Sequence, residues 1–127
     1  MRVHHVALWT HNLERMRVFY VDVLGGESGS LYENPRTGLR SYFISFSGGA
    51  RVELMTRTSE GMPPDVPSGW GYPHIAMSVG SRAAVDDTIT RFKGRGVTVL
   101  SPPRTTGDGY YEAVVEDPEG NKIEIVE

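Results

Sequence analysis

Apolar and polar positions alternate with a period of two at the start of the chain and then with a helical period. His5–Trp9 is expected to form a strand, and the apolar spacing of 12–24 predicts a helix. Asn12 is a suitable N-cap for this helix, and Gly25 and Gly26 are expected to end it. Alternating, β-rich composition then predicts three more strands, at roughly Ser28–Glu33, Leu39–Phe46 and Ala50–Thr56.

The same order of patterns returns in the second half of the chain. A strand is expected at His74–Val79, followed by Ser81 as N-cap of a helix through Lys93 that Gly94 or Gly96 would end. Three strands follow, at roughly Val97–Leu100, Tyr110–Glu116 and Lys122–Val126. The last two strands of each half are joined by residues typical of hairpin turns, Ser47-Gly48-Gly49 and Asp117-Pro118-Glu119-Gly120-Asn121.

These patterns indicate a weak internal repeat of about seventy residues. His5 and His74 start equivalent strands, and Arg51-Val52-Glu53-Leu54 aligns with Lys122-Ile123-Glu124-Ile125. The sequence therefore predicts an α+β fold in which a strand–helix–three-strand module occurs twice. We expect one domain over 1–127, with module 1 at about 1–57, a Pro-, Gly- and Ser-rich linker at 58–71 and module 2 at about 72–127.

Composition narrows the classes of protein that fit. The 127 residues contain no Cys, which excludes a disulfide framework, a thiolate metal site and a Cys nucleophile. The net charge of −3, with no run of like charges longer than two, argues against a nucleic-acid partner. No stretch approaches the ~20 apolar residues of a membrane span, and the N-terminus lacks the apolar core of a secretory signal. We expect a soluble, cytoplasmic protein that acts on a small molecule.

Side-chain alternation places four polar residues on sheet faces that the helices would not cover. His5 shares its face with Ala7, His74 shares its face with Ala76, and Glu53 and Glu124 each lie between two aliphatic residues. Taken singly, a strand Glu is usually solvent-facing and a strand His is usually a packing residue. Their recurrence at equivalent strands of both halves favours a shared site instead.

Two imidazoles and two carboxylates form a nitrogen and oxygen donor set. Such a set suits zinc, nickel, cobalt, manganese or ferrous iron better than calcium or a soft ion. With four protein ligands, an octahedral ion keeps two neighbouring positions for a substrate with two adjacent oxygens. A carboxylate beside that substrate could move a proton between adjacent carbons, which indicates an isomerisation or a related lyase reaction.

At this point the chain resembles the vicinal oxygen chelate superfamily, which includes glyoxalase I, bleomycin-resistance proteins and extradiol dioxygenases. The resemblance rests on HHVALWTHNLERMRVFYVDVLGG, ARVELMT, PHIAMSV and, most specifically, YYEAVVEDPEGNKIEIVE. It implies paired βαβββ modules that form an incomplete barrel around a divalent metal, and a homodimer. The order of the polar residues is similar to glyoxalase I, which implies one ion, zinc or nickel first, held by His5, Glu53, His74 and Glu124. It also implies that Glu53 and Glu124 transfer the proton.

Four further residues are candidates for substrate binding. Trp9 stands where bacterial glyoxalase I typically has an arginine, and Arg57 stands where it commonly has an asparagine. Arg104 could bind an anionic group at the rim of the cleft, although a solvated loop arginine is at least as common. Tyr110 could line the pocket, although strand aromatics are usually just packed.

Three functions remain open at this stage. The first is a divalent-metal-dependent lyase or isomerase of glyoxalase I type that acts on an α-oxo or hemithioacetal substrate. The second is an extradiol dioxygenase-like enzyme, which typically uses only two His and one carboxylate on iron. The third is a metal-free binding protein of bleomycin-resistance type, a class that generally lacks this ligand set.

Overall fold

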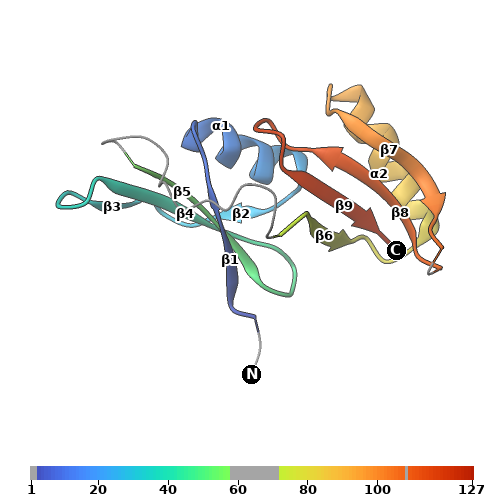
Figure 1. Cartoon of the computed structure of the whole chain (residues 1–127), viewed down its shortest axis with the longest axis horizontal. Coiled ribbons are helices and arrows are strands. Elements are labelled where there is room, and N and C mark those ends of the chain that lie inside the picture. Colours follow the sequence, from blue (N-terminus) through green and yellow to red (C-terminus); the bar gives the residue numbers. More distant parts are fainter. Residues whose placement is uncertain (1–2, 58–71, 108) are drawn as a thin grey trace. The chain divides into compact units, whose positions relative to one another are not determined.

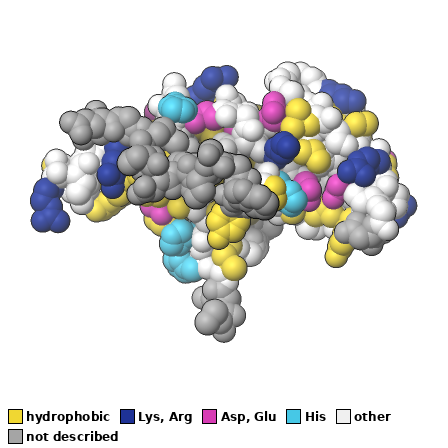
Figure 2. Space-filling model, in the orientation of Figure 1, with side chains coloured by type: hydrophobic (Ala, Val, Ile, Leu, Met, Phe, Trp, Pro, Cys, Tyr) yellow, Lys and Arg dark blue, Asp and Glu magenta, His cyan; other side chains and the backbone are white. Residues whose placement is uncertain are grey.

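The chain divides into two compact units, residues 1–66 and 67–127. The computed structural model describes residues 3–57, 72–107 and 109–127. The linker expected at 58–71 lies outside the described residues. No helix within the described ranges is long and apolar enough to cross a membrane. On the face that Figure 2 shows, Lys and Arg side chains are scattered rather than gathered into one patch.

Unit 1 builds one mixed sheet with its helical segment against one face (Figure 1). The strand order is β1-β5-β4-β2, and β3 also pairs with β4. The first and last strands, β1 and β5, pair in parallel, and the other pairs are antiparallel. The elements are β1 (His5–Trp9), α1 (Leu13–Val18), η1 (Phe19–Val23), β2 (Glu27–Ser28), β3 (Tyr32–Asn34), β4 (Leu39–Ser45) and β5 (Arg51–Arg57).

Unit 2 repeats this path in a four-stranded sheet of order β6-β9-β8-β7, again with its first and last strands parallel. The predicted α+β fold with two βαβββ modules is therefore confirmed. Neither sheet closes into a barrel in the described part of the chain. The elements are β6 (Ile75–Ser78), α2 (Arg82–Gly94), β7 (Val99–Thr105), β8 (Tyr111–Glu116) and β9 (Lys122–Val126).

Each unit buries the sheet face that its helix covers. The buried apolar side chains of unit 1 are Leu13, Met16, Phe19, Tyr20, Ile44, Val52 and Leu54. Those of unit 2 are Val85, Ile89, Phe92, Ala113, Val115, Ile123 and Ile125. Because successive side chains of a strand point to opposite faces, residues between these buried positions face away from the helix.

The helix caps agree with the sequence, but the first helix does not continue as predicted. Asn12 Oδ1 accepts a hydrogen bond from the backbone N–H of Arg15 at 3.0 Å, and Ser81 Oγ accepts one from Ala84 at 3.2 Å. The continuous α-helix expected over 12–24 instead becomes a π-helix after Val18. Leu24 donates to the carbonyl of Phe19, five residues earlier, at 3.2 Å. This wider turn brings the adjacent residues Phe19 and Tyr20 both into the core.

Two strand predictions were wrong in extent. The strand expected at Ser28–Glu33 is split into β2 and β3, and the intervening Gly29 donates to the carbonyl of Phe43 at 2.8 Å. The strand expected at Val97–Leu100 starts later and runs to Thr105, through two prolines. This is tolerated because β7 is the edge strand of its sheet and shifts register along β8.

Gly26 occupies a place that leaves no room for a side chain. A Cβ there would lie 2.5 Å from Ile44 Cγ2 and 2.9 Å from the carbonyl oxygen of Tyr20. We predict that Gly26→Ala lowers the free energy of unfolding by about 1–3 kcal/mol, because core and backbone must shift. Gly48→Ala is the matched control, since a Cβ there meets nothing within 4 Å. Equal denaturation midpoints for the two variants would contradict this packing.

A tyrosine ties the helix of each unit to its sheet. The Tyr42 hydroxyl donates to Glu14 Oε1 at 2.6 Å, and the Tyr111 hydroxyl donates to Asp86 Oδ1 at 2.8 Å. The bond from Tyr42, followed by one from Arg17, holds the pKa of Glu14 below its usual range. The same bond raises the pKa of Tyr42.

The lowered pKa of Glu14 makes the contribution of this bond depend on pH. The stabilisation is present above about pH 4.3 and is lost as the pH falls through the lowered pKa of the folded state. We predict that Tyr42→Phe lowers the free energy of unfolding at pH 7 by less than about 1 kcal/mol, because the pair is exposed. The difference from wild type should vanish towards pH 2 in urea titrations. Tyr32→Phe, at an exposed tyrosine of β3, controls for loss of a hydroxyl; a difference that persists at pH 2 would exclude this explanation.

Candidate metal centre

In unit 1, the parallel pairing of β1 and β5 brings a histidine next to a glutamate. Ala7 is the Cα partner of Glu53, and His5 lies two residues before Ala7 on the same face of β1. His5 Nε2 is 3.6 Å from Glu53 Oε2. The Glu53 side chain is 15% exposed and that of His5 is 37% exposed, so both can be reached from solvent.

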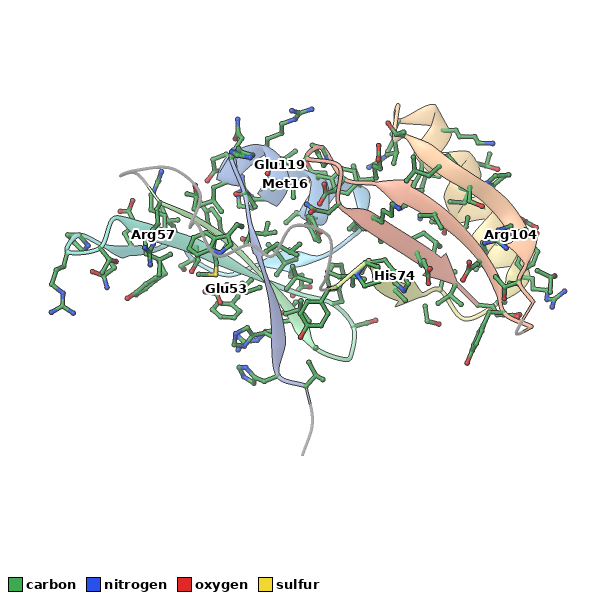
Figure 3. The ribbon with its side chains drawn as sticks, viewed as in Figure 1. Met16, Glu53, Arg57, His74, Arg104 and Glu119 are labelled. Carbon is green, nitrogen blue, oxygen red and sulfur yellow. The ribbon has the colours of Figure 1, made fainter. Side chains whose placement is uncertain are left out.

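Unit 2 makes the same arrangement with β6 and β9. Ala76 is the Cα partner of Glu124, and His74 lies two residues before Ala76. His74 Nδ1 is 3.2 Å from Glu124 Oε1, and the two side chains are 40% and 19% exposed. His74 was expected to open the strand, but it precedes the first residue of β6. Figure 3 labels His74 beside β6, and Glu53 on β5 of the other unit.

The two His–Glu pairs are therefore equivalent in the register of their parallel strands as well as in sequence. In each unit the glutamate faces an alanine across a parallel ladder, and the histidine is two residues before that alanine, at the start of β1 in unit 1 and just before β6 in unit 2. The residues flanking each glutamate are buried under the helix, so the carboxylate faces the other way. The parallel pairing of the first and last strands thus makes each unit present one imidazole and one carboxylate together.

The donor atoms of each pair suit a shared divalent ion. Two neighbouring ligands, each roughly 2.0–2.2 Å from one ion, lie roughly 3.0–3.4 Å apart. The nitrogen–oxygen separations of 3.6 Å and 3.2 Å are close to that spacing. Each pair offers two possible donor atoms, and no group of three or more His, Cys, Asp or Glu side chains gathers within residues 3–57, 72–107 and 109–127.

Sequence reasoning missed the neighbours of His5. Its ring meets Phe43 edge-on, with ring centroids 5.3 Å apart. His4 was not among the candidate residues, but His4 Nδ1 lies 2.9 Å from His5 Nδ1. Arg51 Nη2 in turn lies 3.0 Å from His4 Nε2. The only sequence signal for Arg51 was its place at the start of the repeated four-residue motif.

In unit 2, His74 and Glu124 line a hollow of about 310 Å³ together with Leu100, Ser101 and Lys122. None of the last three was singled out from the sequence. Leu100 and Ser101 belong to β7, whose true extent the pattern did not reveal.

The two substrate-binding candidates of unit 2 lie outside the residues that line this hollow. Arg104 lies within β7 rather than in a loop (Figure 3). Its Nε donates to Ser101 Oγ at 3.1 Å, and its Nη2 is 3.4 Å from Glu112 Oε1. Tyr110 is 58% exposed just before β8, so it is not a packed strand aromatic.

The two candidates of unit 1 contact each other. The guanidinium carbon of Arg57 lies 5.5 Å from the centre of the Trp9 ring. Both residues stand at the C-terminal ends of their parallel strands, β5 and β1, on the face that carries Glu53 and His5. Figure 3 labels Glu53 and Arg57, which both come from β5. No ion pair of Arg57 is found among the described residues.

The sequence as a whole matches a known family. Residues 2–125 match the family model of the glyoxalase/bleomycin resistance protein/dioxygenase superfamily. The chain belongs to this superfamily. Lactoylglutathione lyase of Salmonella typhimurium is 32% identical over 127 residues, which are 100% of this chain and 93% of that protein. The homologous enzyme thus has nearly the same length as this chain.

One further relative has a different named activity, and one solved structure shows the same fold. Biphenyl-2,3-diol 1,2-dioxygenase 3 of Rhodococcus globerulus is 28% identical over 126 residues, which cover 98% of this chain and 62% of that protein. The crystal structure of lactoylglutathione lyase from Agrobacterium tumefaciens has a TM-score of 0.72 at 23% identity, covering 98% of this chain and 91% of that one. This structural likeness shows the glyoxalase-type fold.

Proposed function

We propose that the protein is a divalent-metal-dependent lyase or isomerase of glyoxalase I type, which transfers a proton on an α-oxo or hemithioacetal substrate. The observation that carries this proposal is the His–Glu pair that each unit forms at the same register. A superfamily member that binds its ligand without metal has no need for two such pairs. The 32% identity to a lactoylglutathione lyase over the full chain supports the same reaction class.

In this proposal one ion is held by His5, Glu53, His74 and Glu124, with zinc or nickel first and cobalt, manganese or iron as alternatives. The imidazole nitrogens and carboxylate oxygens suit these ions, and the separation within each pair fits neighbouring ligands. When bound, the ion would act as a Lewis acid that polarises the substrate carbonyl.

The two carboxylates are proposed to move the proton. Glu53 and Glu124 are partly buried, at 15% and 19% exposure, so a bound substrate would shield them from water while they stay within its reach. One carboxylate would accept the proton from one carbon and return it to the neighbouring carbon.

Arg57 and Trp9 are proposed to bind the far end of the substrate. Arg57 lies four residues beyond Glu53 on the same face, which corresponds to roughly 13 Å along the strand. A guanidinium held over an indole offers two donors to a carboxylate and a flat apolar surface beside them. A substrate that is extended and anionic at one end would use both ends of this face. Arg104 and Tyr110 are proposed as further substrate contacts from unit 2.

The two units are proposed to act as one domain over residues 1–127, and the protein is proposed to be a homodimer. Unit 1 of one chain would complete the ligand set with unit 2 of either the same chain or its partner. The cytoplasmic location expected from the sequence belongs to the same proposal.

The metal is tested most simply on protein purified without chelator. We predict about one bound divalent ion per chain, and turnover of methylglyoxal with a thiol such as glutathione that depends on this ion. Glu53→Gln and Glu124→Gln should each weaken metal binding at least tenfold and lower kcat by roughly 10²-fold or more, because a neutral amide is a poor ligand and a poor base.

Glu33→Gln is the control, since Glu33 pairs with Arg40 at 2.8 Å in the same sheet as Glu53. Failure to bind any of the five metals after reconstitution would contradict the proposal and favour a metal-free binding protein. Oxygen-dependent cleavage of a catechol would favour the dioxygenase instead.

The proposed role of Arg57 predicts a selective effect on substrate binding. Arg57→Met should raise KM roughly tenfold for a hemithioacetal that carries a carboxylate, with kcat little changed, because one charge-assisted contact is lost. The same variant should leave KM unchanged for the adduct of a thiol without carboxylates. Arg36→Met, in the turn before β4, controls for loss of a positive charge. A fall in kcat alone, or an equal change with both thiols, would exclude a carboxylate-binding role.

A further inference from the structure

Three side chains of unit 1 form a connected chain that ends at His5. Arg51 Nη2 is 3.0 Å from His4 Nε2, and His4 Nδ1 is 2.9 Å from His5 Nδ1. Two further contacts hold this chain in place. The backbone N–H of Arg51 donates to the carbonyl of His4 at 3.2 Å, and the guanidinium carbon of Arg51 lies 4.4 Å from the centre of the Phe43 ring.

The chemistry of arginine fixes the direction of these hydrogen bonds. A guanidinium has only donors, so His4 Nε2 must be the acceptor of the Arg51 bond. A neutral His4 then carries its proton on Nδ1 and donates it to His5 Nδ1. His5 is left with its own proton on Nε2, the nitrogen that faces Glu53 Oε2 at 3.6 Å.

We propose that His4 and Arg51 are positioning residues that select the tautomer of His5. The rest of this inference, which concerns metal, depends on the proposed function. A metal-ligating imidazole presents an unprotonated nitrogen to the ion, and the hydrogen bond of its other nitrogen decides which one that is. The residues beside His5 therefore control whether Nε2 is available on the side of Glu53.

The hydrogen bonds between Arg51, His4 and His5, as they stand, oppose metal ligation through His5 Nε2. For Nε2 to become a ligand, the His5 proton must move to Nδ1 and point at His4 Nδ1. His4 would then have to carry its proton on Nε2, where it meets the donors of Arg51. Two donors cannot share a hydrogen bond, so the guanidinium must leave His4. Arg51 thus stabilises the metal-free arrangement, and His4 transmits its effect to His5.

The corresponding residues of unit 2 cannot form the same hydrogen bonds, so unit 2 provides an internal control. The positions that correspond to His4 and Arg51 are Pro73 and Lys122, and a proline side chain has no hydrogen-bonding group. Among the described residues nothing comparable engages His74 Nδ1, which instead faces Glu124 Oε1 at 3.2 Å. The two pairs thus present different ring nitrogens to their carboxylates, Nε2 in unit 1 and Nδ1 in unit 2.

The tautomers are read directly from the ring nitrogens in long-range ¹H–¹⁵N correlation spectra of the metal-free, full-length protein, near pH 8. We expect His4 to be the Nδ1–H tautomer, which free imidazole side chains disfavour, and His5 to be the Nε2–H tautomer. Arg51→Met should return His4 to Nε2–H, whereas Lys122→Met should leave it unchanged. His4→Leu should shift the His5 Nδ1 resonance, because that nitrogen loses its donor.

An Nε2–H tautomer at His4 in the wild-type protein, or an Nδ1–H tautomer that survives in Arg51→Met, would overturn the proposal. Neither result depends on metal binding. The comparison with His4→Leu keeps the test available should Arg51→Met fold poorly.

The second measurement is the affinity of each protein for Zn²⁺, determined by competition with a chelator. Both Arg51→Met and Lys122→Met remove one positive charge beside a His–Glu pair, so their general electrostatic effects are matched. Only Arg51→Met also removes the opposing hydrogen bond, and it should bind Zn²⁺ roughly tenfold more tightly than Lys122→Met. Equal affinities would overturn the coupling between Arg51 and metal. If the wild-type protein, Arg51→Met and Lys122→Met all failed to bind Zn²⁺, the proposed function would be overturned, while the tautomer result would stand.

Discussion

The parallel ladder between the first and last strand of each unit is the constraint on which the candidate site depends. It brings residues about 48 positions apart in the sequence, such as His5 and Glu53, onto one sheet face within contact distance. The register of this ladder is fixed by burial, since Val52, Leu54, Ile123 and Ile125 are all buried under a helix. A slip of one residue would exchange buried aliphatic side chains for carboxylates, at a large cost in free energy. The core under each helix therefore positions the polar pair on the opposite face.

Much of this arrangement could be predicted from the sequence, because the same pattern occurs in both halves of the chain. The alternation around Glu53 and Glu124 predicted which face each carboxylate occupies, and the matching histidines predicted their partners. The N-caps at Asn12 and Ser81 were equally readable, because their side chains act on backbone groups only three residues away. Local periodicity and short-range hydrogen bonds carried these predictions.

What the sequence could not predict depends on contacts between elements. The π-helix turns Phe19 and Tyr20 both into the core, and β7 continues through two prolines because it lies at a sheet edge. The hydrogen bonds that link Arg51, His4 and His5 could not be predicted from the sequence for a similar reason. Alternation placed His4 out of phase with His5, but the strand begins only at His5, so the periodicity does not govern the residue before it.

The two units differ most where function would need specificity. The His–Glu pairs repeat, whereas the Arg57–Trp9 pair and the Arg51–His4 contact occur in unit 1, and Lys122 and Leu100 beside a hollow occur in unit 2. In the proposed function, two like His–Glu pairs with unlike surroundings would hold one ion symmetrically and its substrate in one orientation. The most direct test of the central claim is anomalous scattering from a metal-loaded crystal at the absorption edge of the bound ion. One peak within about 2.3 Å of His5, Glu53, His74 and Glu124 is the predicted result, and a peak that lacks either pair would contradict it.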